Sequence, residues 1–181
     1  MDLSAFFGVF VWLFVVVVCS ILLFVFRTKK ILTFICGMIL FLAGFLAVVI
    51  TSGGVIKDFI DIPLILGILL QCVPVMFISG YYADFANAFR IVFKNKKSTL
   101  NELKKSRDSI SFLEKILFVS ATFIAFTGFF SIFSHLDDWA SFFPNAAIAI
   151  LPFSYAFILF FFLKSLKGSI EQKIIDFDEN S

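Results

Sequence analysis

Five long apolar runs with uncharged centres constrain this chain more than any other feature. They lie at Ala5–Phe26, Ile31–Thr51, Ile62–Tyr81, Phe112–Ser134 and Ala146–Leu163. An α-helix needs about 20 predominantly apolar residues to cross the hydrocarbon core of a bilayer, and each run is of about that length. The runs are apolar all round, whereas the strands of a membrane barrel alternate apolar and polar residues. We therefore predict an all-α, polytopic membrane protein with about five transmembrane helices.

The composition excludes a soluble globular domain. Hydrophobic residues make up 61% of the 181 residues and charged residues 15%, against roughly 45–50% and 25% in soluble domains. Phenylalanine alone occurs 29 times. So much apolar surface would cause aggregation in water, whereas lipid acts as a solvent for it. The composition implies that the protein is in contact with a lipid bilayer, which is thus one of its partners. We expect no nucleic-acid partner.

Lysine and arginine are concentrated in alternate connections between the apolar runs. Residues 27–30, the loop 82–111 and the segment after Leu163 hold almost all of them, whereas the connections 52–61 and 135–145 hold one lysine between them. Basic connections remain on the cytoplasmic side during insertion. The pattern predicts an N-terminus outside and a C-terminus in the cytoplasm, which fits an odd number of crossings.

The same boundaries suggest three segments. We expect an N-terminal transmembrane helix in residues 1–30, a membrane domain in residues 31–165 and a cytoplasmic tail in residues 166–181. The loop 82–111 is the only long polar connection, and we predict a short helical hairpin there. Its amphipathic first part continues the third helix beyond the bilayer or lies along the membrane surface. The run from Ser98 to Glu102 matches a capping box, which predicts an extension of the fourth helix.

Two prolines mark expected helix starts. Asp61 precedes Pro63, and a carboxylate before a proline is typical of a helix N-terminus, where the missing N–H costs nothing. Pro144 is predicted to mark the start of the fifth helix in the same way. Pro152 lies inside that helix, where it produces either a packing kink or a kink that lines a polar path.

Motifs for enzymatic catalysis are nearly absent. The single histidine, His135, has Asp137 and Asp138 near it, but this group is more typical of a hydrated interfacial loop than of a general base. The three cysteines lie in apolar runs without the spacing of metal ligands. We therefore expect no catalytic residue, no metal site and no cofactor, and the protein is not predicted to be an enzyme.

Several motifs in a fixed order resemble those of the MotA/TolQ/ExbB proton channel family. Phe59-Ile60-Asp61-Ile62-Pro63 is similar to the outer-loop Phe-Ile-Asp-Ile-Pro-Ser of MotA-type flagellar stator subunits. The last two apolar runs resemble the last two helices of that family. The matching positions there are Ser120 to Ala125, Asp137-Asp138, Pro144, Ala147 to Leu151 and Tyr155.

The resemblance implies a proton or sodium channel subunit in the bacterial inner (plasma) membrane. It implies a homo-oligomer, a pentamer, around a single-span MotB/ExbD-like partner that supplies the protonatable carboxylate and couples ion flow to mechanical work. Thr122 corresponds to a pore-facing threonine of the family, and Ser154 leaves a hydroxyl near the family's threonine pair. Both are candidates for the ion pathway, whereas Asp61, Pro63, Pro144, Pro152 and Tyr155 form the structural motif.

Three differences from MotA leave an alternative open. The N-terminal helix is additional, the large cytoplasmic domain is reduced to about 30 residues, and the threonine pair falls at Pro152 and Phe153. The alternative is a non-conducting membrane scaffold or accessory protein that has the same architecture.

Overall fold

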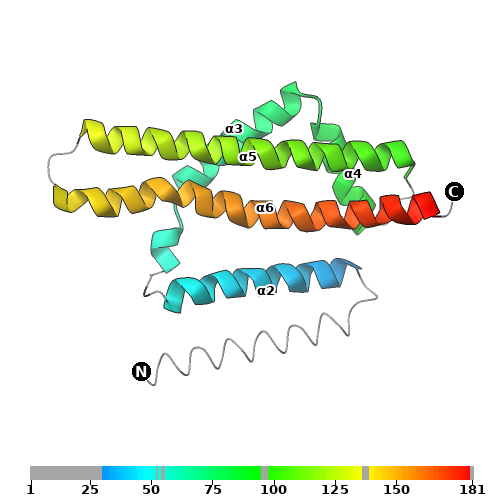
Figure 1. The fold of residues 1–181 in the computed structure, drawn as a ribbon, viewed down its shortest axis with the longest axis horizontal. Coiled ribbons are helices and arrows are strands. Elements are labelled where there is room, and N and C mark those ends of the chain that lie inside the picture. The colour runs from blue at the N-terminus through cyan, green and yellow to red at the C-terminus, as the bar shows by residue number, and fades with distance from the viewer. Residues whose placement is uncertain (1–29, 52, 54–55, 95–97, 136–138, 180–181) are drawn as a thin grey trace, which may run out of the picture. The chain divides into compact units, whose positions relative to one another are not determined.

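The structure is a computed structural model that describes residues 30–51, 53, 56–94, 98–135 and 139–179. Within these ranges the regular structure is helical throughout (Figure 1), which confirms the predicted all-α class. The elements are α2 (Lys30–Thr51), η1 (Ile56–Phe59), α3 (Ile62–Ile78), α4 (Tyr82–Phe93), α5 (Leu100–Ser134), η2 (Trp139–Ser141) and α6 (Phe142–Glu179).

Four of the described helical segments are long and apolar enough to cross a bilayer. They are Thr33–Thr51, Lys57–Ile78, Leu100–Ser134 and Trp139–Glu179. The predicted first span, Ala5–Phe26, lies outside the described residues. The chain is therefore a polytopic membrane protein of the predicted class.

The chain divides into two compact units between Ile60 and Asp61. In the first unit, the ring of Phe45 on α2 packs edge-on against Phe59 of η1, with 6.2 Å between the ring centroids. The second unit begins at Asp61 and contains α3 to α6.

Helices α5 and α6 form a long antiparallel hairpin (Figure 1). They contain 35 and 38 residues, which correspond to lengths of about 52 and 57 Å against a hydrocarbon core of about 30 Å. The register pairs Phe133 with Phe142 at one end and Phe118 with Phe157 further along. Each helix is therefore long enough to cross the bilayer and to continue well beyond it.

Small side chains bring the two helices of the hairpin together. Ala121, Ala125, Ala149 and Ala156 are all buried. A Cβ atom added at Gly128 would lie 3.1 Å from the Cβ atom of Ala149. Glycine and alanine permit such close approach between transmembrane helices, where dispersion rather than the hydrophobic effect drives association. Of the three alanines at positions 146, 147 and 149 of α6, Ala149 is the buried one.

The start of α5 confirms the predicted capping box. Thr99 is the N-cap residue, and its hydroxyl accepts a hydrogen bond from the backbone N–H of Glu102 at 3.3 Å. The Glu102 carboxylate accepts one in return from the backbone N–H of Thr99 at 3.1 Å. Two amides that a helix start leaves unpaired are thus satisfied, and the fourth predicted span extends back to Leu100.

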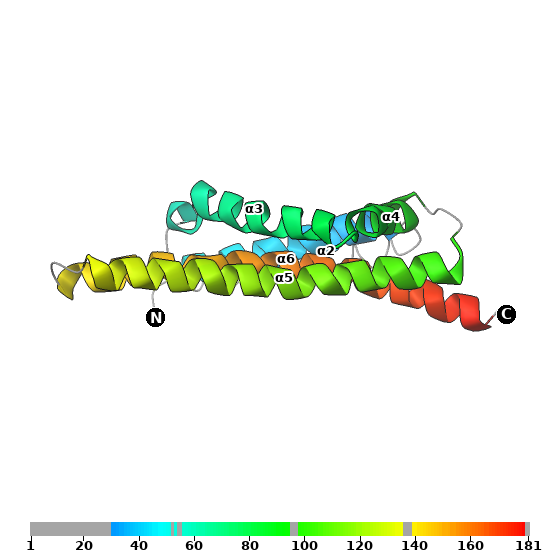
Figure 2. The same cartoon turned by 90° about the horizontal axis from the view of Figure 1, so that it is seen from above.

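Helix α4 is separate from α3, so the predicted continuation of the third helix is wrong. The expected span Ile62–Tyr81 ends earlier, at Ile78, because Gly80 has a φ of +76° that interrupts the helix. The chain then turns, and the ring of Tyr81 lies against Phe112 of α5 at 4.7 Å. Figures 1 and 2 show α4 crossing both helices of the hairpin, on the same side as α3.

A hydrophobic core at one end of the second unit holds α4 in place across the hairpin. Its buried members include Ala88, Ile91, Leu103, Ile110, Leu166 and Ile170. The Lys173 ammonium group on α6 donates a hydrogen bond to the carbonyl oxygen of Ile91, and this satisfies one of the last carbonyl groups of α4. We call this part of the unit, made of α4, residues 100–114 of α5 and residues 164–179 of α6, the basic end.

Candidate functional site

Three residues of the predicted structural motif meet at the start of α3. Asp61 is the N-cap residue of α3, and its carboxylate accepts a hydrogen bond from the backbone N–H of Leu64 at 3.1 Å. Pro63 lies in the first turn, where no N–H is needed. The backbone N–H of Asp61 donates to the phenolic oxygen of Tyr155 on α6 at 2.8 Å. The motif therefore anchors α3 to the hairpin.

The two motif prolines on α6 have different environments. Pro152 is fully buried, and α6 continues through it. Pro144 is exposed and is the third residue of α6, because that helix begins at Phe142. The predicted start at Pro144 is thus two residues too late, since η2 leads directly into α6 and the proline fits within its first turn.

The two candidates for the ion pathway do not form a joint polar site. The hydroxyl of Thr122 donates to the carbonyl oxygen of Phe118 in its own helix at 2.8 Å, a common arrangement for threonine in helices. Thr122 is exposed on α5, whereas Ser154 is half-buried on α6. No hydrogen bond joins the two within the described part of the chain.

Thr122 lies within an exposed apolar face of α5. We call this face the α5 stripe. Its residues recur every three or four positions along α5, and each is more than half exposed. They are Val119, Phe123, Phe126, Phe130 and Phe133. In a membrane protein such a face contacts lipid or another transmembrane helix.

A pocket with both polar and apolar walls lies at the end of the hairpin opposite the basic end. It has a volume of about 330 Å³ and is lined by His135, Ser131, Asn145 and Pro152 among others. His135 is exposed, and its Nδ1 lies 3.0 Å from the carbonyl oxygen of Ser131. Asp137 and Asp138, which sequence places near this histidine, lie outside the described residues.

A buried carboxylate at the basic end was not among the predicted site residues. Glu114 on α5 is 7% exposed. Its Oε2 atom lies 3.9 Å from both Lys164 Nζ and Lys167 Nζ of α6, whereas its Oε1 atom is buried without a hydrogen-bond partner. Lys164 also lies over the Phe160 ring, 5.4 Å from its centroid.

The antiparallel register explains why these charges meet. Once α5 and α6 pair Phe118 with Phe160, Glu114 lies one turn before Phe118 in α5 and faces the lysines that lie one and two turns after Phe160 in α6. Sequence alone shows a glutamate at the entrance of one span and two lysines after the exit of another. Only the register of the hairpin brings them together.

The described residues offer no other obvious centre of chemistry. Within residues 30–179, apart from the four short gaps, no group of three His, Cys, Asp or Glu side chains could hold a metal ion. Buried Cys72 lies 3.7 Å from the Ser120 hydroxyl, between α3 and α5. Comparison with protein-family models, with curated proteins and with solved structures gave no match for this chain.

Proposed function

We propose that the chain is a proton or sodium channel subunit of the MotA/TolQ/ExbB type that works with a single-span partner. One observation carries this proposal. Thr122, the residue that the resemblance assigns to the ion pathway, lies on the face of α5 that α3, α4 and α6 leave exposed. A partner helix or a second copy can therefore approach Thr122 without displacing any of these helices.

The distribution of acidic residues supports a need for a partner. The centres of the five apolar runs contain no aspartate, glutamate or histidine. Glu114 is at the entrance of its span and has two lysines beside it. A proton path across the bilayer generally requires an intramembrane ionisable group, so that group would come from the partner.

The charge pattern supports a location and an orientation for this subunit. Exposed cations at the basic end include Arg90, Lys104, Lys105 and Lys164. By the positive-inside rule this end lies in the cytoplasm, and by the resemblance the membrane is the bacterial inner membrane. Helix α4 then lies along the cytoplasmic surface of the bilayer, where amphipathic helices are stable.

A non-conducting scaffold is the second candidate, and the surroundings of Thr122 favour it. The hydroxyl already bonds to its own helix, and its neighbours on the α5 stripe, Val119 and Phe126, are 68% and 70% exposed. Phenylalanine rings offer no hydrogen-bond acceptor that could replace the hydration shell of an ion. A scaffold would use the same face for helix packing alone.

Ion flux through the reconstituted complex tests the proposal. The complex is purified with its co-purifying chains, placed in vesicles, and compared with Thr122→Val and Thr127→Val variants. Thr127 is the matched control, because it is also exposed on α5 and its hydroxyl also bonds to its own helix, at 2.8 Å from the Ile124 carbonyl oxygen. A channel subunit predicts that Thr122→Val alone reduces flux at unchanged complex mass. Unaltered flux in both variants, or no flux at all, favours the scaffold.

A further inference from the structure

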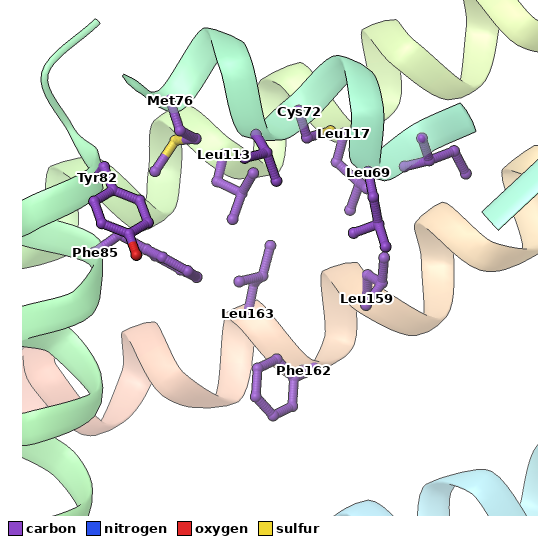
Figure 3. Close-up of a pocket in the computed structure, with 12 residues that line it drawn as sticks. Leu69, Cys72, Met76, Tyr82, Phe85, Leu113, Leu117, Leu159, Phe162 and Leu163 are labelled. Carbon is purple, nitrogen blue, oxygen red and sulfur yellow. The ribbon is translucent and has the colours of Figure 1, made fainter. Parts of the chain in front are cut away.

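An apolar cavity of about 240 Å³ lies among α3, α4, α5 and α6 (Figure 3). All four helices supply walls, and its principal side chains are Leu69, Met76, Phe85, Leu117, Leu159 and Leu163. None of the residues used in the proposed ion pathway contributes to it. The cavity is therefore a separate feature of the second unit.

The chemistry of the walls excludes water as the occupant. The lining exposes only apolar atoms to the cavity. A buried water requires about two to four polar partners, whereas an apolar cavity of about 150 Å³ stays dry and can bind benzene. A space of this size and character thus suits a flexible hydrocarbon chain.

The position of the cavity specifies the source of that hydrocarbon. Leu163 precedes Lys164, and Leu113, another lining residue, precedes Glu114. The cavity therefore lies immediately on the membrane side of the charges at the basic end. Leu69 and Val73 are 44% and 46% exposed although they line it, so the cavity opens at the surface that the acyl chains of the bilayer surround.

Side chains near the opening are those that favour the depth of lipid head groups. Tyr82 lines the cavity, is 49% exposed and stacks on Phe77 at 4.1 Å, and Figure 3 shows its hydroxyl at the edge of the lining. Tyrosine is enriched at the membrane interface. Arg90, about two turns further along α4, and Lys94, the residue that follows α4, are exposed cations that attract anionic head groups.

We propose that this cavity binds one acyl chain of an anionic phospholipid from the leaflet at the basic end. The acyl chain fills the space between α3 and α6, and the head group lies beside Tyr82 under the cations of α4. The occupied cavity joins the turn between α3 and α4 to the hairpin. This site does not depend on the proposed channel function, because a scaffold with the same fold would bind the same lipid.

Photo-cross-linking on the purified protein tests the proposal. The probe is phosphatidylglycerol with a diazirine group in one acyl chain, added to the full-length protein in mild detergent. Size-exclusion chromatography removes unbound lipid before irradiation, and peptide mass spectrometry then locates the adducts. We expect adducts at residues 68–76 and 82–85. We expect few adducts on the α5 stripe, because lipid there would contact an open surface and not an enclosed cavity.

Filling the cavity supplies the matched variants. Leu69→Phe and Leu159→Phe add volume from opposite walls, whereas Leu70→Phe makes the same change at a neighbouring residue that is 74% exposed and does not line the cavity. Both filling variants should lose adducts several-fold while Leu70→Phe retains them, with equal thermal unfolding as the check on folding. Equal labelling in all three variants, or adducts mainly on the α5 stripe, would overturn the proposal.

Discussion

The backbone N–H of Asp61 donates a hydrogen bond to the phenolic oxygen of Tyr155 at 2.8 Å, although 94 residues separate the two in the chain. The Asp61 carboxylate is not involved, because it caps α3 through the N–H of Leu64. One residue therefore performs two separate tasks: its side chain starts a helix, and its backbone joins that helix to α6.

Because these two tasks use different groups, their loss should be nearly additive. Asp61→Ala removes the cap and should cost about 1 kcal/mol. Tyr155→Phe removes the bond to the backbone N–H and should also cost about 1 kcal/mol. Reversible unfolding of single and double variants in mixed micelles measures these costs, with Asp61→Asn as the control that keeps a capping oxygen. A double variant no less stable than either single variant would show that the two contacts act as one.

The close approach of α5 and α6 at Gly128 makes a second prediction. An alanine at this position places its Cβ atom 3.1 Å from that of Ala149, whereas nothing lies within 4 Å of a Cβ atom added at Gly168 on α6. Gly168→Ala should stabilise the helix by up to about 1 kcal/mol. Gly128→Ala should gain less, and Gly128→Leu should destabilise the hairpin by about 1–3 kcal/mol through overpacking. Thermal unfolding in detergent ranks the three, and a fully tolerated Gly128→Leu would refute the tight contact.

The charges at the basic end predict an asymmetric response to substitution. Replacing both Lys164 and Lys167 with methionine leaves the buried Glu114 carboxylate without a cation, which should cost about 3 kcal/mol. Glu114→Gln should cost less, because the lysine side chains are 49% and 18% exposed and can turn toward solvent. The triple variant should recover most of the loss.

Unfolding of the three variants under the same conditions provides the comparison. A double lysine variant as stable as Glu114→Gln would mean that the carboxylate does not depend on these cations. The Oε1 atom of Glu114 has no hydrogen-bond partner. The comparison therefore also measures how much stability is lost when this carboxylate loses the lysine charges beside it.

The orientation of the spans can be measured directly. In a background where Cys19, Cys36 and Cys72 are replaced by alanine, single cysteines at Asp58 and Lys104 report two connections on opposite sides of the predicted topology; both positions are exposed. A membrane-impermeant maleimide added to intact cells should label Asp58→Cys, and Lys104→Cys only after lysis. The reverse labelling pattern would show that the predicted orientation of the spans is wrong.

Local signals allowed much of the fold to be predicted. The cap at Asp61 and the capping box of Thr99 and Glu102 depend on residues that are close together in sequence, so the starts of α3 and α5 could be placed from sequence. The break between α3 and α4 was missed because a run that is apolar through Tyr81 gives no sign that Gly80 adopts a positive φ.

The candidate site was less predictable for a different reason. Glu114 and its lysines are 50 or more residues apart, and their contact depends on the register of the α5–α6 hairpin. The sequence of the connection between these two helices does not show that register. Asp61 and Tyr155 were both identified by resemblance, but their hydrogen bond likewise required the three-dimensional arrangement. Thr122 was assigned to an ion pathway by resemblance, and that assignment stays a prediction.

The mass of the complex purified in mild detergent, with every co-purifying chain identified, tests the proposed function most directly. We predict several copies of this chain together with a single-span chain that carries an acidic residue inside its apolar run, because the spans of this chain supply none. A monomer without such a partner would contradict it.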